Sequence, residues 1–145
     1  MSRPLFMPSV LSRAAITACF ALIGAGPAIA QDCGVDVPGA KKVESSEYVL
    51  AYRTMPAPVP MGRHFTVDLV VCPRSGAAVP DRVQVDAHMP EHRHGMNYKA
   101  LVKPLGSGRF HAEGLMFHMP GRWELLFDVQ DGGSTVRLTD SIVLR

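Results

Sequence analysis

The chain of 145 residues has little cysteine, few aromatic residues and, after residue 30, no segment with the periodicity of an amphipathic helix. Aromatic side chains make up 7% of the sequence, and cysteine occurs only at positions 19, 33 and 72. Without helical periodicity, neither a helical bundle nor an alternating βαβ fold is expected. The chain after residue 30 consists of short apolar runs separated by glycine and proline.

The motifs of common enzyme classes are also missing. The sequence has no nucleophile elbow, no glycine-rich phosphate loop and no His-Glu-x-x-His zinc helix. Its carboxylates are scattered, so their spacing nominates no general acid/base pair. A blue-copper redox site needs a cysteine ligand, and Cys72 has no histidine and methionine shortly after it. The sequence therefore predicts that the protein is not an enzyme.

The long apolar segment of the chain is at the N-terminus. Arg3 and Arg13 precede an apolar run over residues 14–23, and the motif Ala-Ile-Ala at 28–30 fits a cleavage site. We therefore expect residues 1–30 to be a cleavable signal peptide and the mature protein to be periplasmic. The run is shorter than the roughly 20 residues of a spanning helix, so no stable membrane insertion is expected after cleavage. Cys19 loosely fits a lipobox but lies too close to Arg13, so ordinary secretion is favoured.

An excess of basic charge is missing from the mature chain. Arg3 and Arg13 leave with the signal peptide, so 13 of the 15 Lys and Arg residues remain, against 13 Asp and Glu. A near-neutral domain has no basic stripe for nucleic acid or anionic lipid. We expect neither partner.

Two cysteines, Cys33 and Cys72, remain after cleavage. An even number in an exported chain predicts a disulfide between them. The alternative is that one or both are thiolate ligands of copper. The disulfide is favoured because both cysteines lie far in sequence from the histidine and methionine clusters described below.

Proline and glycine punctuate the mature chain in the pattern of an all-β domain. The predicted strands are residues 47–54, 63–72, 82–89, 98–104, 108–118, 122–129 and 135–144. Residues 55–62 form a proline-rich connection, and residues 31–46 are expected to be an extended N-terminal arm. Seven short strands in one domain over 47–145 predict an immunoglobulin-like two-sheet β-sandwich.

Histidine and methionine are concentrated in two segments. Residues 88–96 read His-Met-Pro-Glu-His-Arg-His-Gly-Met, and the tripeptide His-Met-Pro recurs at 118–120. Imidazole and thioether form a soft ligand set that suits copper, above all Cu(I). The pattern therefore indicates metal binding.

Strand alternation assigns the side chains of these segments to the core or to the surface. The predicted core set is Val83, Val85, Ala87, Met89, Leu115, Phe117, Met119, Trp123, Leu125, Phe127 and Val129. His88, Met116 and His118 then lie on the outer face. Met89 and Met119 are predicted to be packing residues.

The main predicted metal ligands are His92, His94 and Met96, presented by a flexible loop over residues 90–95, and His118 from the second segment. His88 and Met116 are alternates. Glu91 is a harder donor, so Cu(II) or zinc is an alternative to Cu(I). The isolated His64 and His111 are predicted to be surface residues, and Met55 and Met61 to be packing residues.

Three segments of the sequence resemble a known protein family. The segments 87–96, 108–110 and 114–125, within Met61 to Val129, resemble the YtkA-like domain family, which is related to the periplasmic part of FixH-type proteins. The most specific pieces are Met-Pro followed by His-x-His-Gly-Met, and Met-Pro-Gly-x-Trp-Glu. FixH-type proteins carry an N-terminal membrane helix, whereas this chain has the features of a cleavable signal.

The resemblance implies an exported immunoglobulin-like β-sandwich in the context of copper handling and haem-copper oxidase assembly. It implies that Met89-Pro90 and the Met119-to-Trp123 segment are fold markers. It also implies that His92, His94 and Met96 form the metal-carrying loop, to which His88 and His118 add donors.

Together these observations predict an exported copper-binding protein, acting as a chaperone or buffer in oxidase assembly or copper homeostasis. Its partners would be copper and a periplasmic client or an oxidase assembly factor. The alternative is a metal-free immunoglobulin-like interaction module that docks a periplasmic partner through the same loop, with Arg93 and Tyr98 as contacts.

Overall fold

The computed structural model describes residue 35 and residues 37–145, which form nine β-strands. The strands are β1 (Lys41–Glu44), β2 (Tyr48–Met55), β3 (His64–Pro73), β4 (Arg82–Met89), β5 (His94–Gly95), β6 (Leu101–Gly106), β7 (Arg109–Met116), β8 (Gly121–Gln130) and β9 (Thr135–Leu144). The predicted signal peptide, Cys19 and Cys33 lie outside the described residues. Within those residues there is no helix with the length and apolar character needed to span a membrane.

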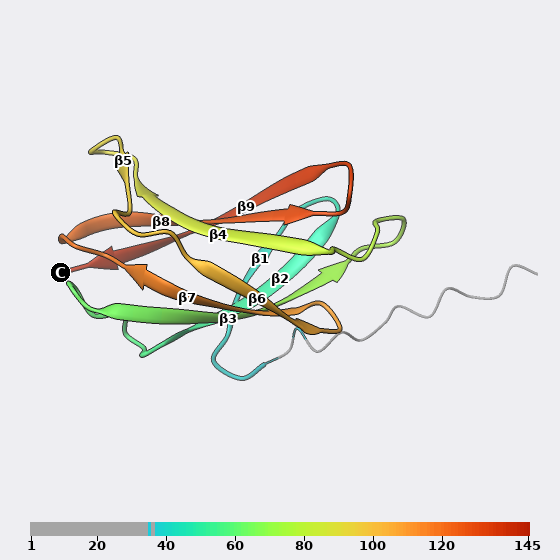
Figure 1. The fold of residues 1–145 in the computed structure, drawn as a ribbon, viewed down its shortest axis with the longest axis horizontal. Coiled ribbons are helices and arrows are strands. Elements are labelled where there is room, and N and C mark those ends of the chain that lie inside the picture. The colour runs from blue at the N-terminus through green and yellow to red at the C-terminus, as the bar shows by residue number, and fades with distance from the viewer. Residues whose placement is uncertain (1–34, 36) are drawn as a thin grey trace, which may run out of the picture.

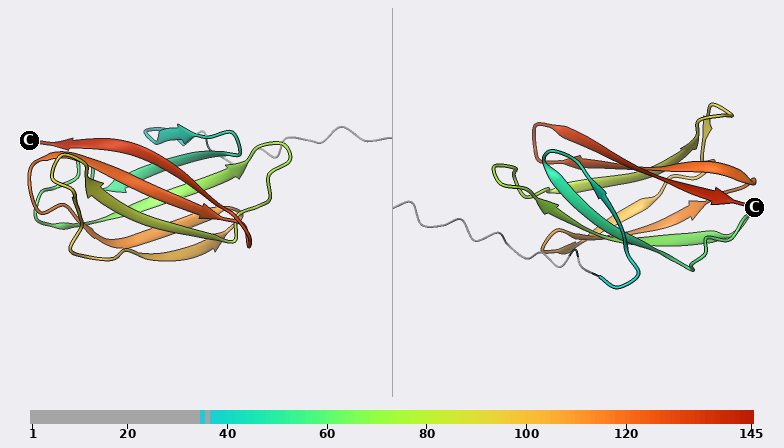
Figure 2. Two further views of the ribbon diagram at one scale, coloured as in Figure 1. Left: turned by 90° about the horizontal axis from the view of Figure 1, so that it is seen from above. Right: turned by 180° about the vertical axis from the view of Figure 1, so that it is seen from behind.

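The strands form two antiparallel sheets that pack face to face (Figures 1 and 2). One sheet has the order β1-β2-β3-β7-β6 and the other the order β5-β4-β8-β9. Apart from the short strands β1 and β5, this is the arrangement of an immunoglobulin sandwich: of the seven other strands, the third, sixth and seventh form one sheet and the remaining four form the other. The predicted all-β sandwich is confirmed.

All seven predicted strands are present, with ends shifted by no more than three residues. The two additional strands are short and form against a neighbour. Strand β1 pairs with β2 through Lys41↔Tyr52 to Glu44↔Val49, within the predicted N-terminal arm. Strand β5 pairs with β4 inside the segment predicted to be a loop. Neither has an apolar alternation of its own that a sequence pattern could reveal.

The core is made by alternating side chains from both sheets. Val83, Val85, Ala87 and Met89 of β4 are all buried, and the residues between them are exposed or half-buried. Strand β8 contributes Trp123, Leu125, Phe127 and Val129, each no more than 1% exposed. No polar or charged residue of the described part of the chain is buried. The predicted core set is therefore confirmed, except that Met119 is only partly buried against the core.

The sandwich has two ends with different contents. At one end β2, β4, β7 and β9 finish and β3 and β8 begin; we call it the His/Met end, and it carries the C-terminus (Figure 1). The opposite end carries the β1–β2, β3–β4, β6–β7 and β8–β9 turns, and we call it the turn end.

Candidate metal-binding site

The fold collects nearly all imidazole and thioether groups at the His/Met end. Of the eight methionines, Met1 and Met7 lie outside the described residues. The other six belong to the strand ends or connections of this end, and so do five of the six histidines: Met55, Met61, Met89, Met96, Met116, Met119, His64, His88, His92, His94 and His118. His111 lies instead in the first half of β7, opposite Asp68. Segments separated by up to about 60 residues of sequence therefore contribute imidazole and thioether groups to the same end of the molecule.

A tight hairpin, not a flexible loop, presents the first histidine segment. The amide N–H groups of His92 and Arg93 both donate to the carbonyl of Met89, at 3.2 and 2.9 Å. Arg93 adopts a left-handed conformation (φ 54°), which returns the chain so that His94 pairs with Met89. The predicted flexible loop over 90–95 is thus wrong in its last two residues, which form β5. The hairpin fixes where His94 lies.

Three imidazole rings lie next to one another at this end. The ring centre of His94 is 5.9 Å from that of His92 and 5.2 Å from that of His118. The Nδ1 of His94 lies 3.1 Å from the carbonyl oxygen of Gly95. An Nδ1–H donating there leaves the Nε2 lone pair available to a metal, the arrangement commonly found behind histidine ligands. The structure therefore brings together the three histidines that the sequence nominated as main ligands.

Trp123 is the platform under two of these rings. Its ring centre is 5.9 Å from that of His94 and 5.3 Å from that of His118, both edge-on. The indole is fully buried, stacks on Phe117 at 4.6 Å and donates its N–H to the carbonyl of Met119 at 3.0 Å. Sequence reasoning assigned Trp123 to the core and missed this second role. Its position two residues after the His-Met-Pro-Gly segment at 118–121 was the available signal.

His88 is directed away from the three rings. It pairs in register with Gly95 and Glu124, and its Nε2 lies 3.0 Å from a carboxylate oxygen of Glu124. Its neighbours Ala87 and Met89 are buried, so His88 faces outward from the four-stranded sheet while His94, paired with Met89, faces inward. His88 was predicted as an alternate ligand, but the fold does not bring it to the three neighbouring imidazoles.

Glu91, the candidate hard donor, is engaged in an ion pair. Its carboxylate accepts a hydrogen bond from the Nε of Arg122 at 2.8 Å. That hydrogen bond is the main reason why the pKa of Glu91 is lowered. A carboxylate already paired with a guanidinium adds little to a zinc or Cu(II) site.

The methionines of this end differ in exposure. Met96 is half-buried against the core, with its N–H donating to Ala87 at 3.1 Å. Met116 is half-buried and pairs in register with His64. Met55 and Met61 are 54% and 51% exposed, so the prediction that they are packing residues is wrong. The proline-rich connection keeps them on the surface.

The spacing of the imidazoles can be compared with that of rings on a common metal. A metal–nitrogen bond of about 2.0 Å places the ring centre about 3.2 Å from the metal, so two such rings have centres about 5 to 6 Å apart. Both measured separations, 5.2 and 5.9 Å, fall in this range. Yet no group of three or more His, Cys, Asp or Glu side chains among residues 35 and 37–145 is arranged to hold a metal ion. A complete site therefore needs either a rotation of exposed His92 or a thioether ligand.

Cys72 is disulfide-bonded and is buried on the outer side of β3, so it offers no thiolate to copper. Its partner lies outside the described residues, as does Cys33.

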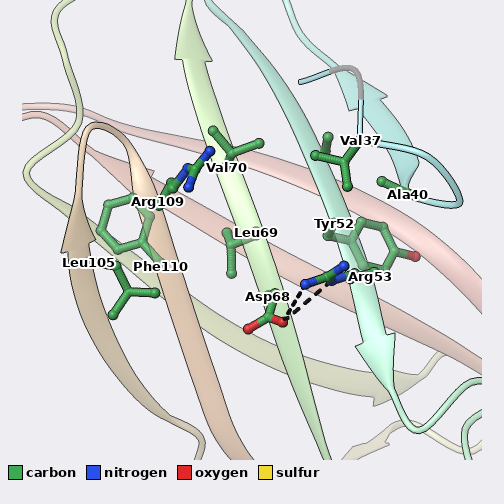
Figure 3. A pocket seen from close by; sticks show the side chains of 11 residues that line it. Val37, Ala40, Tyr52, Arg53, Asp68, Leu69, Val70, Leu105, Arg109 and Phe110 are labelled. Atoms are coloured by element: carbon green, nitrogen blue, oxygen red, sulfur yellow. Dashed lines mark hydrogen bonds and ion pairs between the residues drawn. The ribbon is translucent and has the colours of Figure 1, made fainter. Parts of the chain in front are cut away.

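Two surface hollows lie outside the row of three imidazoles. One, of about 340 Å³, is on the outer side of the five-stranded sheet, and its lining includes Val37, Ala51 and Val70 (Figure 3). Its charged side chains include Arg53 and Asp68, which pair with each other at 3.5 Å. The other, of about 510 Å³, lies along β4 beside the segment 99–104. Neither is lined by histidine, cysteine or methionine.

The chain matches no protein-family model, and no curated protein matches its sequence. Among solved structures it is similar to the crystal structure of a DUF4426 family protein from Pseudomonas aeruginosa PAO1. The two are 11% identical, with a TM-score of 0.47 over 74% of this chain and 97% of the other. A likeness of this size assigns no function.

Proposed function

We propose that the protein is an exported copper-binding protein that holds Cu(I) at its His/Met end. The observation that carries the proposal is the row of three imidazoles, with His94 lying 5.9 Å from His92 and 5.2 Å from His118 between ring centres. Met96, two residues after His94 and half-buried against the core, is the thioether that we assign to the site. Two or three imidazoles with one thioether form a soft set that favours Cu(I) over zinc.

The surroundings of the imidazoles support this assignment. Trp123 and Phe117 form an apolar floor under His94 and His118, and an apolar shell limits access of water to a bound ion. On the other side His92 and His118 are exposed, so a metal held there remains accessible to a partner. A half-open site of this kind fits a chaperone or buffer, which must release its metal.

The predicted cleavable signal supports action in the periplasm, and the resemblance to YtkA-like domains supports a role in oxidase assembly or copper homeostasis. The protein would pass copper to a periplasmic client or an oxidase assembly factor.

Competition for Cu(I) against a chelator of known affinity tests the proposal. The mature protein is compared with a triple variant in which His92, His94 and His118 are replaced by alanine, and with His111→Ala as a matched control. We expect the triple variant to bind Cu(I) at least about 100-fold more weakly, equivalent to about 2.7 kcal/mol, and the control to bind like the wild type. Equal affinity of wild type and triple variant would exclude this site.

A second candidate function, a metal-free interaction module, is favoured by the exposed apolar side chains of the same end. Tyr98, Leu101 and Met61 are 44%, 57% and 51% exposed. Such side chains are typical anchors of a protein interface. A wild-type protein that does not compete with the chelator at all would support this module instead.

A further inference from the structure

We propose a second soft-metal site, formed by Met61, His64 and Met116, next to the imidazole row. It rests on the proposed function only for the identity of the metal. Two thioethers and one imidazole are a softer set than the imidazole row, and they favour Cu(I) over Cu(II) or zinc.

The register of β3 against β7 pairs His64 with Met116. Their neighbours Phe65 and Leu115 are fully or almost fully buried, so His64 and Met116 both face outward from the five-stranded sheet. Directly opposed residues of antiparallel strands have Cβ atoms about 5 Å apart. An imidazole and a thioether on such a pair can therefore reach one ion.

The third donor comes from the proline-rich connection. Met61 forms an isolated parallel bridge with Phe117, and the N–H of Gly62 donates to the Phe117 carbonyl at 2.8 Å. This bridge holds the backbone of Met61 beside the residue that follows Met116, and the half-exposed side chain of Met61 must turn toward His64 and Met116 to reach the same ion. In Figure 1 the beginning of β3 and the end of β7 lie side by side at the C-terminal end of the sandwich. The backbones of the three residues are thus neighbours at the border of two strands and one connection.

Met61 and His64 differ in how freely their side chains can move. Met61 is half exposed, and a methionine has three rotatable side-chain bonds with which to adjust to an ion. The ring of His64 packs edge-on against Tyr98, with ring centres 5.2 Å apart, which limits where it can turn. The imidazole therefore fixes the place of an ion, and the flexible thioethers can adjust to it.

The two sites adjoin through one short segment. Met116 belongs to the second site and His118 to the imidazole row, with Phe117 directed into the core between them. Cu(I) bound by one set of donors therefore lies within a few residues of the other.

A titration with Ag(I), a redox-stable substitute for Cu(I), tests this site in the mature protein. The methyl resonances of the methionines are followed by NMR, and the number of bound ions is measured for wild type, for the double variant Met61→Leu/Met116→Leu, and for Met55→Leu as control. Met55 is equally exposed, and leucine conserves side-chain volume. We expect the wild type and the control to bind two ions, the double variant one, and the Met61 and Met116 resonances to shift.

The outcomes separate this inference from the proposed function. If the resonances of Met61 and Met116 do not shift, or if the double variant still binds as many ions as Met55→Leu, the second site is excluded whatever the imidazole row does. If the triple histidine variant keeps one ion that shifts both resonances, the second site stands even where the first fails. Met61→Leu alone, at a half-exposed position, repeats the test should the double variant not fold.

Discussion

The two ends of the sandwich use their polar groups differently. At the turn end, hydrogen bonds that close the turns occupy them: the Ser45 hydroxyl accepts the N–H of Tyr48 at 2.9 Å, and the Asp131 carboxylate accepts both the backbone N–H and the hydroxyl of Ser134. The hydroxyl of Tyr48 joins two turns, since it donates to the Ala78 carbonyl and lies 3.3 Å from Asp131. At the His/Met end, backbone hydrogen bonds close the hairpin and leave most imidazoles and thioethers outside them.

This difference shows which end can carry a ligand. A side chain whose hydrogen bonds close a turn cannot be given to a metal without loss of stability. The rings of His92 and His118 make only ring contacts, and His94 uses one nitrogen for the Gly95 carbonyl. The comparison predicts that removing a polar side chain at the turn end lowers stability, whereas removing an imidazole of the row at the His/Met end lowers Cu(I) affinity.

Trp123→Ala gives the largest expected effect, and it is the case in which stability and binding are lost together. It removes a fully buried indole and its stacking on Phe117, which costs about 3–5 kcal/mol in the free energy of unfolding. It also removes the floor under His94 and His118, so Cu(I) affinity should fall. Urea unfolding and chelator competition measure the two. Trp123→Phe should retain most of both, and a stable alanine variant with full affinity would contradict this role.

Gly121→Ala, compared with Gly76→Ala, tests how tightly the backbone of the His/Met end is packed relative to that of the turn end. Gly121 has φ 123°, and an added Cβ would lie 2.6 Å from the terminal methyl of buried Met89. We expect a loss of about 2 kcal/mol, because backbone strain and crowding add. Gly76→Ala at the turn end meets no atom within 4 Å and should cost only the strain, about 1 kcal/mol. Thermal unfolding compares them. Replacing Met89 by the shorter leucine should restore part of the stability lost in Gly121→Ala. Equal losses of stability in the two glycine variants would exclude the predicted clash with Met89.

Much of the fold was predictable because its signal is local. The alternation of Val83, Val85 and Ala87 assigns each side chain of β4 to one face, and prolines and glycines mark the turns. Strand β5 was not predictable, since two residues, His94 and Gly95, contain no alternation and pair only because the hairpin places them against β4.

The site was predictable in its chemistry but not in its grouping. The histidine and methionine content of residues 88–96 indicated soft ligands, yet His88 and His94 face opposite sides of the sheet. That separation depends on the turn at Arg93, which no periodicity reveals. The meeting of His64 with Met116 depends on pairing between β3 and β7, about fifty residues apart, and long-range register cannot be read from one sequence.

His94→Ala compared with His88→Ala sharpens the comparison within the His/Met end. His94 is the middle ring of the row, so its loss should weaken Cu(I) binding at least about tenfold, or about 1.4 kcal/mol. His88 faces the other side and pairs with Glu124, so His88→Ala should leave the affinity unchanged. Chelator competition measures both, and urea unfolding should show little change for His94→Ala. Equal loss in both variants would contradict the conclusion that His88 does not contribute to the site.

Tyr48→Phe gives the smallest expected effect and is the counterpart at the turn end. Removing the hydroxyl breaks its hydrogen bond to Ala78 and should cost about 1 kcal/mol, with Cu(I) affinity unchanged. Burial, followed by the charge of Asp131, raises the pKa of Tyr48. A raised pKa means that the folded protein favours the neutral phenol, so this stabilisation is complete below the ordinary tyrosine pKa of about 10 and is lost as the pH rises above it. Unfolding curves between neutral and strongly alkaline pH should therefore show a shallower decline for Tyr48→Phe than for the wild type. A variant that weakened Cu(I) binding would contradict the separation of the two ends.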